Sequence, residues 1–263
     1  MLRRLIVRPG AIGDFIVSLP AMESLRSGYT ELWTGSPNVP LGRFADTARS
    51  IASTGLDRLG ITGADDVIEK LRKFDSIVSW YGANRPEFRE LVQARHLPFE
   101  FHTALPTADA RMHAVDFYLK QLGLEPGAVP RIRCTAGETG FAVIHPFAAS
   151  ARKRWPLPRF EQLARRLEKR MPVRWCCGPE DDFPDAVRIP DLYELGCWLA
   201  GARIFIGNDS GIGHLAAAAE TPVIALFGPT DPAIWAPRGA QVTVVAKSSL
   251  EDISVDEVED AVG

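Results

Sequence analysis

The stretch IGNDSGIGHLAAAAETPVIALFGPTDP, residues 206–232, places an apolar run, a small polar loop, an alanine-rich segment and a second apolar run in succession. Short apolar runs bounded by loops are typical of buried parallel strands, and the segment between them is typical of a crossover helix. The four consecutive alanines carry little bulk, so this helix is expected to pack very close to its sheet. The stretch therefore predicts a strand–helix–strand unit of an α/β protein.

The same alternation of strands and helices runs along the chain on both sides of a different segment. Residues 124–138, LEPGAVPRIRCTAGE, are rich in proline and glycine and lack periodicity, which indicates a linker. We therefore expect two Rossmann-like domains, residues 1–128 and 139–263, that face each other across a central cleft. A capping box from Ser254 to Glu257 predicts a last helix over 254–262, which we expect to pack back on the N-terminal domain.

Two local expectations concern the N-terminal half. Residues 14–26 have the apolar spacing of a helix, in which Pro20 should cause a kink or a break. Residues 43–60 are expected to form a short region of helix and turns.

Composition limits the class of protein. Apolar residues make up 46% and charged residues 24% of the 263 residues, and the formal net charge is −3, so no global field favours nucleic acid. No run approaches the roughly 20 apolar residues of a membrane-spanning helix, and the start has no secretory signal. We expect a cytoplasmic protein, peripheral at most on the inner face of the membrane. The four scattered cysteines favour neither disulfides nor a zinc site.

The loops that follow the strands are the places to look for a site, because ligands of α/β sheets bind beyond the carboxyl ends of strands. After the first strand comes RPGAIGD, residues 8–14, a G-x-x-G-D pattern that differs from the G-x-G-x-x-G of dinucleotide sites. Its glycines would let a ligand approach the backbone. Asp14, at a helix start, is either a helix cap or a functional carboxylate, and both interpretations stay open.

Two further loops carry charge. Residues 145–156, HPFAASARKRWP, place the Ser150 hydroxyl and three consecutive cations around Lys153 where an anion would be held, although a solvated basic turn is equally compatible. The acidic run that begins at Glu180 is either solvated surface or an acceptor for hydrogen bonds from sugar hydroxyls.

The quoted stretch itself predicts an anion site. Ser210 and Gly211 would leave free backbone N–H groups at a helix N-terminus, with His214 one turn further on. Asp209 would repel phosphate, so it is expected to organise the loop or to contact a sugar hydroxyl. In the GPTDP turn, Thr230 and Asp231 either face the same cleft or only form a rigid turn. The chain has no Walker motif and no D-x-D cluster, so we expect a diphosphate held with no metal and no cofactor.

Together these motifs resemble glycosyltransferase family 9, the ADP-heptose:lipopolysaccharide heptosyltransferases. The matching segments are R-P-G-A-I-G-D-x-x-x-x-L-P, K-R-W-P, G-P-E-D, G-N-D-S-G-x-x-H-L-A-A-A and G-P-T-D-P. The resemblance implies a GT-B fold and an inverting, metal-independent transfer from a nucleotide-diphosphate sugar such as ADP-heptose. It also implies that Asp14 is the general base, that Lys153 binds phosphate, and that Ser210, Gly211 and His214 hold the diphosphate. From the loops themselves we expect Gly13, Ser150 and Asp209 to complete the donor site, with Glu180, Thr230 and Asp231 near the nucleoside or the sugar.

The sequence also departs from this family. The N-terminal half is shorter than is usual, and apart from Arg8, Arg85 and Arg89 few basic residues lie near its predicted loop ends, where an acidic acceptor would bind. The expected acceptor is a cell-envelope glycan or glycolipid such as lipopolysaccharide core. Two alternatives stay open: a relative that uses another nucleotide sugar, as a UDP-sugar transferase or 2-epimerase, and a nucleotide-sugar binding protein without turnover.

Overall fold

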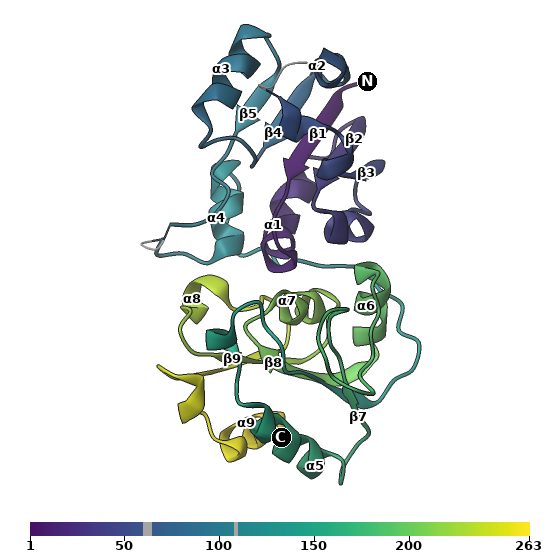
Figure 1. Ribbon diagram of the computed structural model, residues 1–263, viewed down its shortest axis with the longest axis vertical. Coiled ribbons are helices and arrows are strands. Elements are labelled where there is room, and N and C mark those ends of the chain that lie inside the picture. The colour runs from purple at the N-terminus through teal and green to yellow at the C-terminus, as the bar shows by residue number, and fades with distance from the viewer. Residues whose placement is uncertain (60–64, 108–109) are drawn as a thin grey trace.

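The computed structural model describes residues 1–59, 65–107 and 110–263. The described chain folds into two α/β domains, one above the other in Figure 1, joined by an extended segment that includes residues 124–138. Within the described residues, each domain holds one five-stranded sheet with helices packed against it. The predicted two-domain α/β architecture is confirmed.

The N-terminal sheet is entirely parallel, with strand order β3-β2-β1-β4-β5. Its central strand carries the apolar run Leu5-Ile6-Val7, which is fully buried because helices cover both faces of a parallel sheet. The strands are β1 (Arg3–Arg8), β2 (Tyr29–Thr34), β3 (Thr47–Ser50), β4 (Ser76–Ser79) and β5 (Phe99–Phe101). The helices are α1 (Ile12–Ser24), α2 (Asp65–Leu71), α3 (Pro86–Ala94) and α4 (Ala114–Gln121), with the 3-10 turns η1 (Ser36–Leu41), η2 (Ile51–Ser53) and η3 (Leu56–Arg58).

The C-terminal sheet is also parallel, with strand order β10-β9-β8-β6-β7. Its strands are β6 (Phe141–His145), β7 (Val173–Trp175), β8 (Ala202–Asn208), β9 (Val223–Phe227) and β10 (Val242–Ala246). The helices are α5 (Leu157–Leu167), α6 (Leu192–Leu199), α7 (Gly211–Ala218), α8 (Pro232–Trp235) and α9 (Val255–Val262), with the 3-10 turns η4 (Ala151–Lys153) and η5 (Leu250–Asp252). The opening stretch of the sequence is thus β8, α7 and β9, as predicted.

In each sheet there is a point at which successive strands stop adding to one side and begin to add to the other. Open α/β sheets bind ligands at such points of reversed strand order. In the N-terminal sheet the reversal lies between β1 and β4, and in the C-terminal sheet between β6 and β8. The loops at these points begin at Pro9, Trp80, Pro146 and Asp209. Three of these loops, those at Pro9, Pro146 and Asp209, are ones that the sequence had already marked as polar or glycine-rich, and the loop at Trp80 is not.

Two local predictions in the N-terminal half are only partly right, since the expected helix and the expected turns are present but two details differ. Helix α1 runs through Pro20 without a break, because burial of Phe15, Leu19 and Met22 offsets the one hydrogen bond that the proline cannot donate. The region 43–60 contains an edge strand, β3, besides its 3-10 turns. This strand is only partly buried, so its sequence lacks the apolar pattern that marks a strand.

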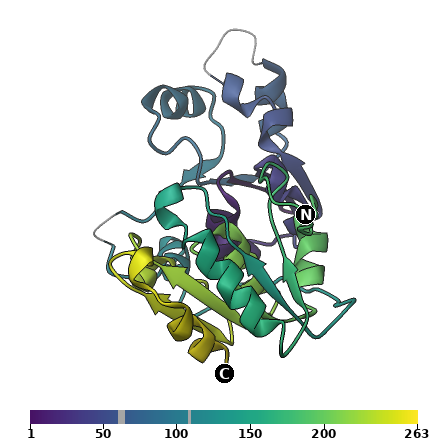
Figure 2. The same cartoon turned by 60° about the horizontal axis from the view of Figure 1, so that its bottom comes forward.

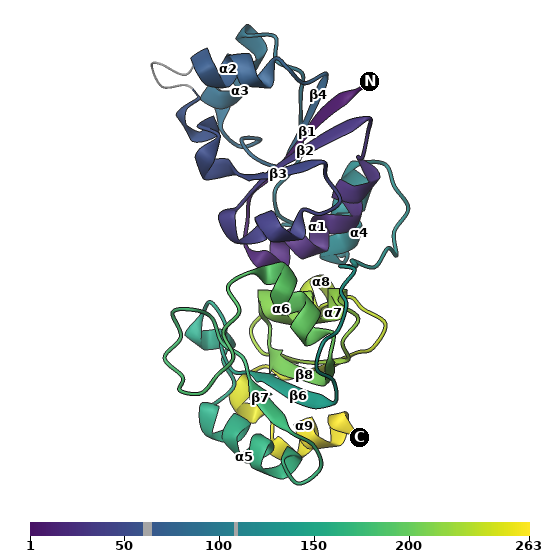
Figure 3. The ribbon, with the colours of Figure 1, turned by 90° about the vertical axis from the view of Figure 1, so that its right-hand side faces the viewer.

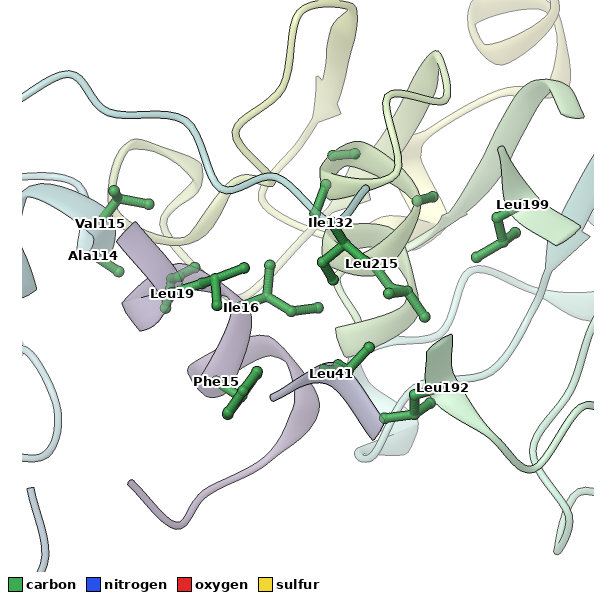
Figure 4. Close-up of a cluster of buried hydrophobic side chains, with 14 of the residues drawn as sticks. Phe15, Ile16, Leu19, Leu41, Ala114, Val115, Ile132, Leu192, Leu199 and Leu215 are labelled. Carbon is green, nitrogen blue, oxygen red and sulfur yellow. The ribbon is translucent and has the colours of Figure 1, made fainter. Parts of the chain in front are cut away.

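A shared apolar core joins the two domains. Helix α1 packs on α7, and η1 packs on α6 (Figure 3). Ile16 and Leu19 of α1 belong to one buried cluster with Leu215 of α7. The same cluster holds Leu41 and Leu192, which lie beside each other in the close-up of this core (Figure 4). Burial of apolar area between the domains stabilises their association.

Polar contacts at α4 add to this interface. Asp116 receives a bidentate pair of hydrogen bonds from Arg238, at 2.7 Å for each oxygen. The His113 Nε2 lies 2.9 Å from the Ala236 carbonyl oxygen, while its Nδ1 accepts from the Val115 amide, so Nε2 carries the proton and donates. Helix α4 of the N-terminal domain is therefore fixed to the loop that follows α8 in the C-terminal domain.

Helix α9 stays with the C-terminal domain, and the expectation that residues 254–262 return to the N-terminal domain is wrong. Val255 and Val258 are buried in one cluster with Phe160 of α5, and α9 lies beside α5 in Figures 1 and 2. Arg166 of α5 also pairs with Asp256 and Glu259, each at 2.6 Å. The apolar face of α9 finds its partner in the helix that follows β6.

Candidate functional site

The loops that follow β1, β6 and β8 line one cavity of about 670 Å³ between the domains. The N-terminal domain contributes residues 10–13 and 36–38, and the C-terminal domain contributes residues 147–149, 176–179, 188–190 and 210–212. A cavity of this volume is within the range of sites for small molecules and nucleotides.

The first turns of two helices meet at this cavity. Helix α1 begins at Ile12 and helix α7 begins at Gly211. The two helix starts lie so close together that a side chain at position 211 would not fit. A Cβ on Gly211 would lie 2.7 Å from the Cβ of Ile12 and 3.0 Å from the Gly13 nitrogen. Because unpaired amides and a partial positive charge mark each helix N-terminus, two such ends at one place favour an anion.

Ser210 precedes α7 and faces this region. Its hydroxyl oxygen is buried and has no hydrogen-bond partner within the described residues, and Ser210 lines the cavity. A buried hydroxyl without a partner carries a cost that a bound acceptor would remove. The side chain is therefore available to a ligand at the start of α7.

Arg154 and Arg188 are the cations that line the cavity. Lys153 is not among the lining residues, but it pairs with Asp209, the residue that precedes Ser210. The Lys153 Nζ lies 2.6 Å from Asp209 Oδ2, and the Thr230 hydroxyl donates to the same oxygen at 2.7 Å. Asn208 supports the arrangement, because its side chain accepts from the Trp155 amide and donates to the Pro146 carbonyl. Asp209 thus joins the loops that follow β6, β8 and β9.

His214 is buried one turn into α7. A Cβ on Gly13 would lie 3.2 Å from the His214 Cδ2, so the ring packs against the start of α1. Burial lowers the pKa of His214 to about 4, against the opposing effect of the Asp209 carboxylate. At neutral pH the ring is uncharged and can act only as a neutral hydrogen-bonding group.

The lowered histidine pKa values predict acid sensitivity. Burial also lowers the pKa of His113 and of His145. Between pH 6.5 and about 4 the unfolded chain binds protons that the folded chain does not, so the free energy of unfolding falls as the pH falls. His214 alone should account for about 2 kcal/mol between pH 7 and pH 5. Urea unfolding at both pH values measures the change.

A substitution separates His214 from the other groups. In His214→Gln the loss of stability between pH 7 and pH 5 should be smaller than in the wild type. The matched control is His96→Asn, which alters an exposed histidine with a φ of 50° and should leave the loss unchanged. An equal loss in His214→Gln and the wild type would contradict the assignment.

Asp14 lies in the first turn of α1, directly after the cavity-lining residues 10–13, and is half-buried. Its Oδ2 accepts a long hydrogen bond of 3.3 Å from the Ala11 amide, which is a weak form of the predicted cap. Within the described residues no cation forms an ion pair with this carboxylate. The carboxylate therefore keeps oxygen lone pairs free for a ligand.

Other predicted residues stand apart from the cavity. Ser150 and Glu180 are exposed and are not among the residues that line it, although Asp181 is. Asp231 accepts from the Ala233 amide as the cap of α8, and it borders a second hollow of about 600 Å³ with Arg111 and His113.

The arginines expected near the acceptor also differ in position. Arg8 is only 2% exposed and points into the N-terminal domain, so it cannot meet an acceptor as a surface cation. Arg85 and Arg89 are exposed and lie over aromatic rings of their own domain.

Sequence reasoning missed one wall of the cavity. It is apolar and includes Cys176, Ile189, Leu192 and Leu195. The same residue types fill the hydrophobic core, so the sequence gives no signal that distinguishes cavity-lining residues from core residues. It also missed Asn38, which is 1% exposed and donates from Nδ2 to the Gly10 carbonyl at 3.0 Å, holding the glycine turn.

Two further features bear on function. Within the described ranges no group of three or more His, Cys, Asp or Glu side chains is arranged to hold a metal ion. None of the helices in the described parts of the chain has the length and apolar character that crossing a bilayer requires.

Two facing Rossmann-like domains with a cavity between them are the architecture of the GT-B class. The profile of glycosyltransferase family 9 (heptosyltransferase) matches residues 108–260, more than half of the chain. The chain belongs to this family, and the resemblance drawn from its motifs is confirmed.

Individual relatives agree with this membership. Lipopolysaccharide heptosyltransferase 3 of Escherichia coli K12 is 35% identical over 117 residues, which cover 37% of this chain and 33% of that protein. The match thus spans about a third of that relative's length. E. coli ADP-heptose lipopolysaccharide heptosyltransferase II has a TM-score of 0.75 at 17% identity, covering 99% of this chain and 97% of that one. E. coli heptosyltransferase WaaC with ADP has a TM-score of 0.71 at 18% identity, covering 98% of each.

Proposed function

We propose that this protein transfers a sugar, heptose in the first instance, from an ADP-sugar to a cell-envelope glycan such as lipopolysaccharide core. The observation that carries the proposal is the meeting of two helix N-termini, one on each domain, with Lys153 paired to Asp209 just before the start of α7. A nucleoside diphosphate is the kind of ligand that such a site would hold. One solved neighbour of the same fold contains ADP, and the curated relatives are lipopolysaccharide heptosyltransferases.

The proposed step needs a base on one side and charge neutralisation on the other. Asp14 takes the proton of the acceptor hydroxyl, and the hydroxyl oxygen forms a bond to the anomeric carbon. The bond from that carbon to the diphosphate breaks, and ADP leaves with the electron pair. Attack from the face opposite the leaving group inverts the anomeric centre.

The leaving diphosphate would be stabilised by the C-terminal domain. Ser210 and Gly211 offer a hydroxyl and amides at the start of α7, and Lys153 offers a cation. Neutral His214 and the backbone at Gly13 complete the walls, and no metal or cofactor enters the proposed step. Asp209 is partnered by Lys153 and Thr230, so it would hold the lysine in place and leave phosphate contacts to the lysine and the helix end.

The apolar wall gives the nucleoside a place. Cys176, Ile189 and Leu195 form a surface on which a planar base could lie, and Asp181 and Glu180 are the carboxylates nearest in sequence to accept from its ribose. Ser150 and Asp231 remain proposed contacts that domain or loop movement would have to bring to the donor. The proposed acceptor is a glycolipid, which would place the protein on the cytoplasmic face of the membrane during turnover.

Nucleotide binding tests the donor. Thermal and urea unfolding with ADP, UDP, GDP and CMP should show stabilisation by ADP, of about 2.7 kcal/mol at a concentration one hundred times its Kd. Stabilisation by UDP and not by ADP would contradict an ADP-sugar donor and favour the UDP-sugar alternatives. Labelled ADP-heptose incubated with lipopolysaccharide core then tests turnover. Binding of ADP without transfer or hydrolysis of the donor would indicate a binding protein.

A further inference from the structure

Arg8, the last residue of β1, lies directly beneath the turn that leads to Asp14. Its side chain is 2% exposed and makes four hydrogen bonds. It donates to the Pro9 carbonyl at 2.7 Å, the Asp14 carbonyl at 2.9 Å, the Ser18 hydroxyl at 3.0 Å and the Tyr118 hydroxyl at 2.8 Å. All four acceptors are neutral, and no carboxylate of the described residues pairs with Arg8.

A buried guanidinium with neutral partners alone is an expensive feature. Arginine is almost never fully buried unless it is paired, and removing such a charge from water costs several kcal/mol even after relaxation. Packing alone would be served by an apolar side chain of similar volume. The planar fork of arginine, in contrast, can hold several acceptors at fixed angles. Two of the acceptors here are carbonyls at either end of the turn from Pro9 to Asp14.

Tyr118 extends this arrangement to α4. The ring is fully buried, and the Arg8 guanidinium carbon lies 4.9 Å from its centroid. Burial raises the pKa of Tyr118 to about 12, so the hydroxyl stays protonated, accepts from Arg8 and donates to the Ala104 carbonyl at 2.7 Å. The turn before Asp14 is thus fastened to α4 and to the segment that follows β5.

The charge of Arg8 lies close to the Asp14 carboxylate without pairing with it. A Cβ on Gly10 would stand 3.2 Å from Arg8 Nη1 and 3.4 Å from Asp14 Oδ2, so both groups flank Gly10. Gly10 has a φ of +140°, which an L side chain rarely adopts. The guanidinium therefore holds the backbone of the turn and leaves the carboxylate oxygens unoccupied by a cation.

We propose that Arg8, together with Tyr118, is the positioning residue for Asp14, which it holds through the backbone of the Pro9–Asp14 turn. Arg8 acts through Asp14 and does not touch the substrate. The inference rests on the proposed function, in which Asp14 is the base. Arg8, which the sequence placed near the acceptor, thus has a structural role inside the N-terminal domain.

Two variants test the inference. Arg8→Lys keeps the charge and loses the fork, and Tyr118→Phe keeps the ring and loses the hydroxyl. In each, kcat for transfer should fall about tenfold, because small displacements of a reacting group are costly. The Kd for ADP should change much less than kcat, because Lys153 and the start of α7 lie on the C-terminal domain, away from the loosened turn. Hydrogen exchange of the amides in residues 10–14 should become faster.

Arg4→Lys is the matched control, since Arg4 lies on the same strand at its other end and donates to the Leu25 carbonyl. It should leave both kcat and exchange in residues 10–14 unchanged. Wild-type kcat and exchange in both folded test variants would overturn the inference, as would a parallel loss of ADP binding and thermal stability with no separate effect on kcat. If the wild type binds ADP but transfers no sugar, the proposed function fails, and exchange alone then decides whether Arg8 fixes the turn.

Discussion

Replacing Asp14 with Asn is expected to lower the rate of sugar transfer by a factor of about one hundred to ten thousand, the usual range for loss of a general base. Asn has nearly the shape of Asp and can still accept from the Ala11 amide, so α1 should begin as before. The amide cannot take the proton of the acceptor hydroxyl. Transfer of labelled sugar measures the loss, and ADP-induced stabilisation should stay at the wild-type level.

The control is Asp65→Asn, the same change in the first turn of α2 at an exposed position. It should transfer sugar at the wild-type rate. Near-normal transfer by Asp14→Asn would place the base elsewhere. If Asp14→Asn bound ADP less tightly and transferred at a rate reduced only in proportion, Asp14 would be a donor-binding residue.

The fold was predictable where burial gives the sequence a strong pattern. Strands β1, β6, β8 and β9 lie inside their sheets with helices on both faces, so they are continuous apolar runs. Strands β3 and β5 lie at the edges, are short and are partly exposed, and they have no such run. The packing partner of α9 was not predictable, because the sequence shows an apolar face on this helix but not which domain covers that face.

The candidate site was predictable to the extent that it consists of loops at strand ends. Lys153, Asp209 and Thr230 come from three such loops, and the structure joins them in one hydrogen-bonded group. The direction of a side chain was not predictable. Arg8 was expected near the acceptor, but its side chain points into the domain, where it donates to Ser18 of α1 and to Tyr118 of α4. Tyr118 is 110 positions away in the sequence, so this contact has no local sequence signal.

Replacing Lys153 with Ala should weaken ADP binding by about ten- to one-hundredfold, since a hydrogen bond to a charged group contributes about 1.5–3 kcal/mol. AMP should lose less, because it lacks the second phosphate. Titration calorimetry with both nucleotides measures the difference. In the free protein Lys153 pairs with Asp209, whose side chain is 9% exposed. Removal of Lys153 would leave the Asp209 carboxylate unpaired near the phosphates, and its repulsion would add to the loss of affinity.

A neighbouring residue and a double variant separate these effects. Arg152→Ala removes an adjacent, exposed cation of η4 and should change ADP affinity little, because an exposed charge is screened by solvent. Lys153→Ala combined with Asp209→Asn should recover part of the lost affinity if repulsion from the unpaired carboxylate contributes. Equal losses for ADP and AMP, or equal losses in Arg152→Ala and Lys153→Ala, would mean that the basic loop attracts anions in general. A selective loss in Lys153→Ala would mean that one ammonium group, held by Asp209 before the donor arrives, binds the diphosphate.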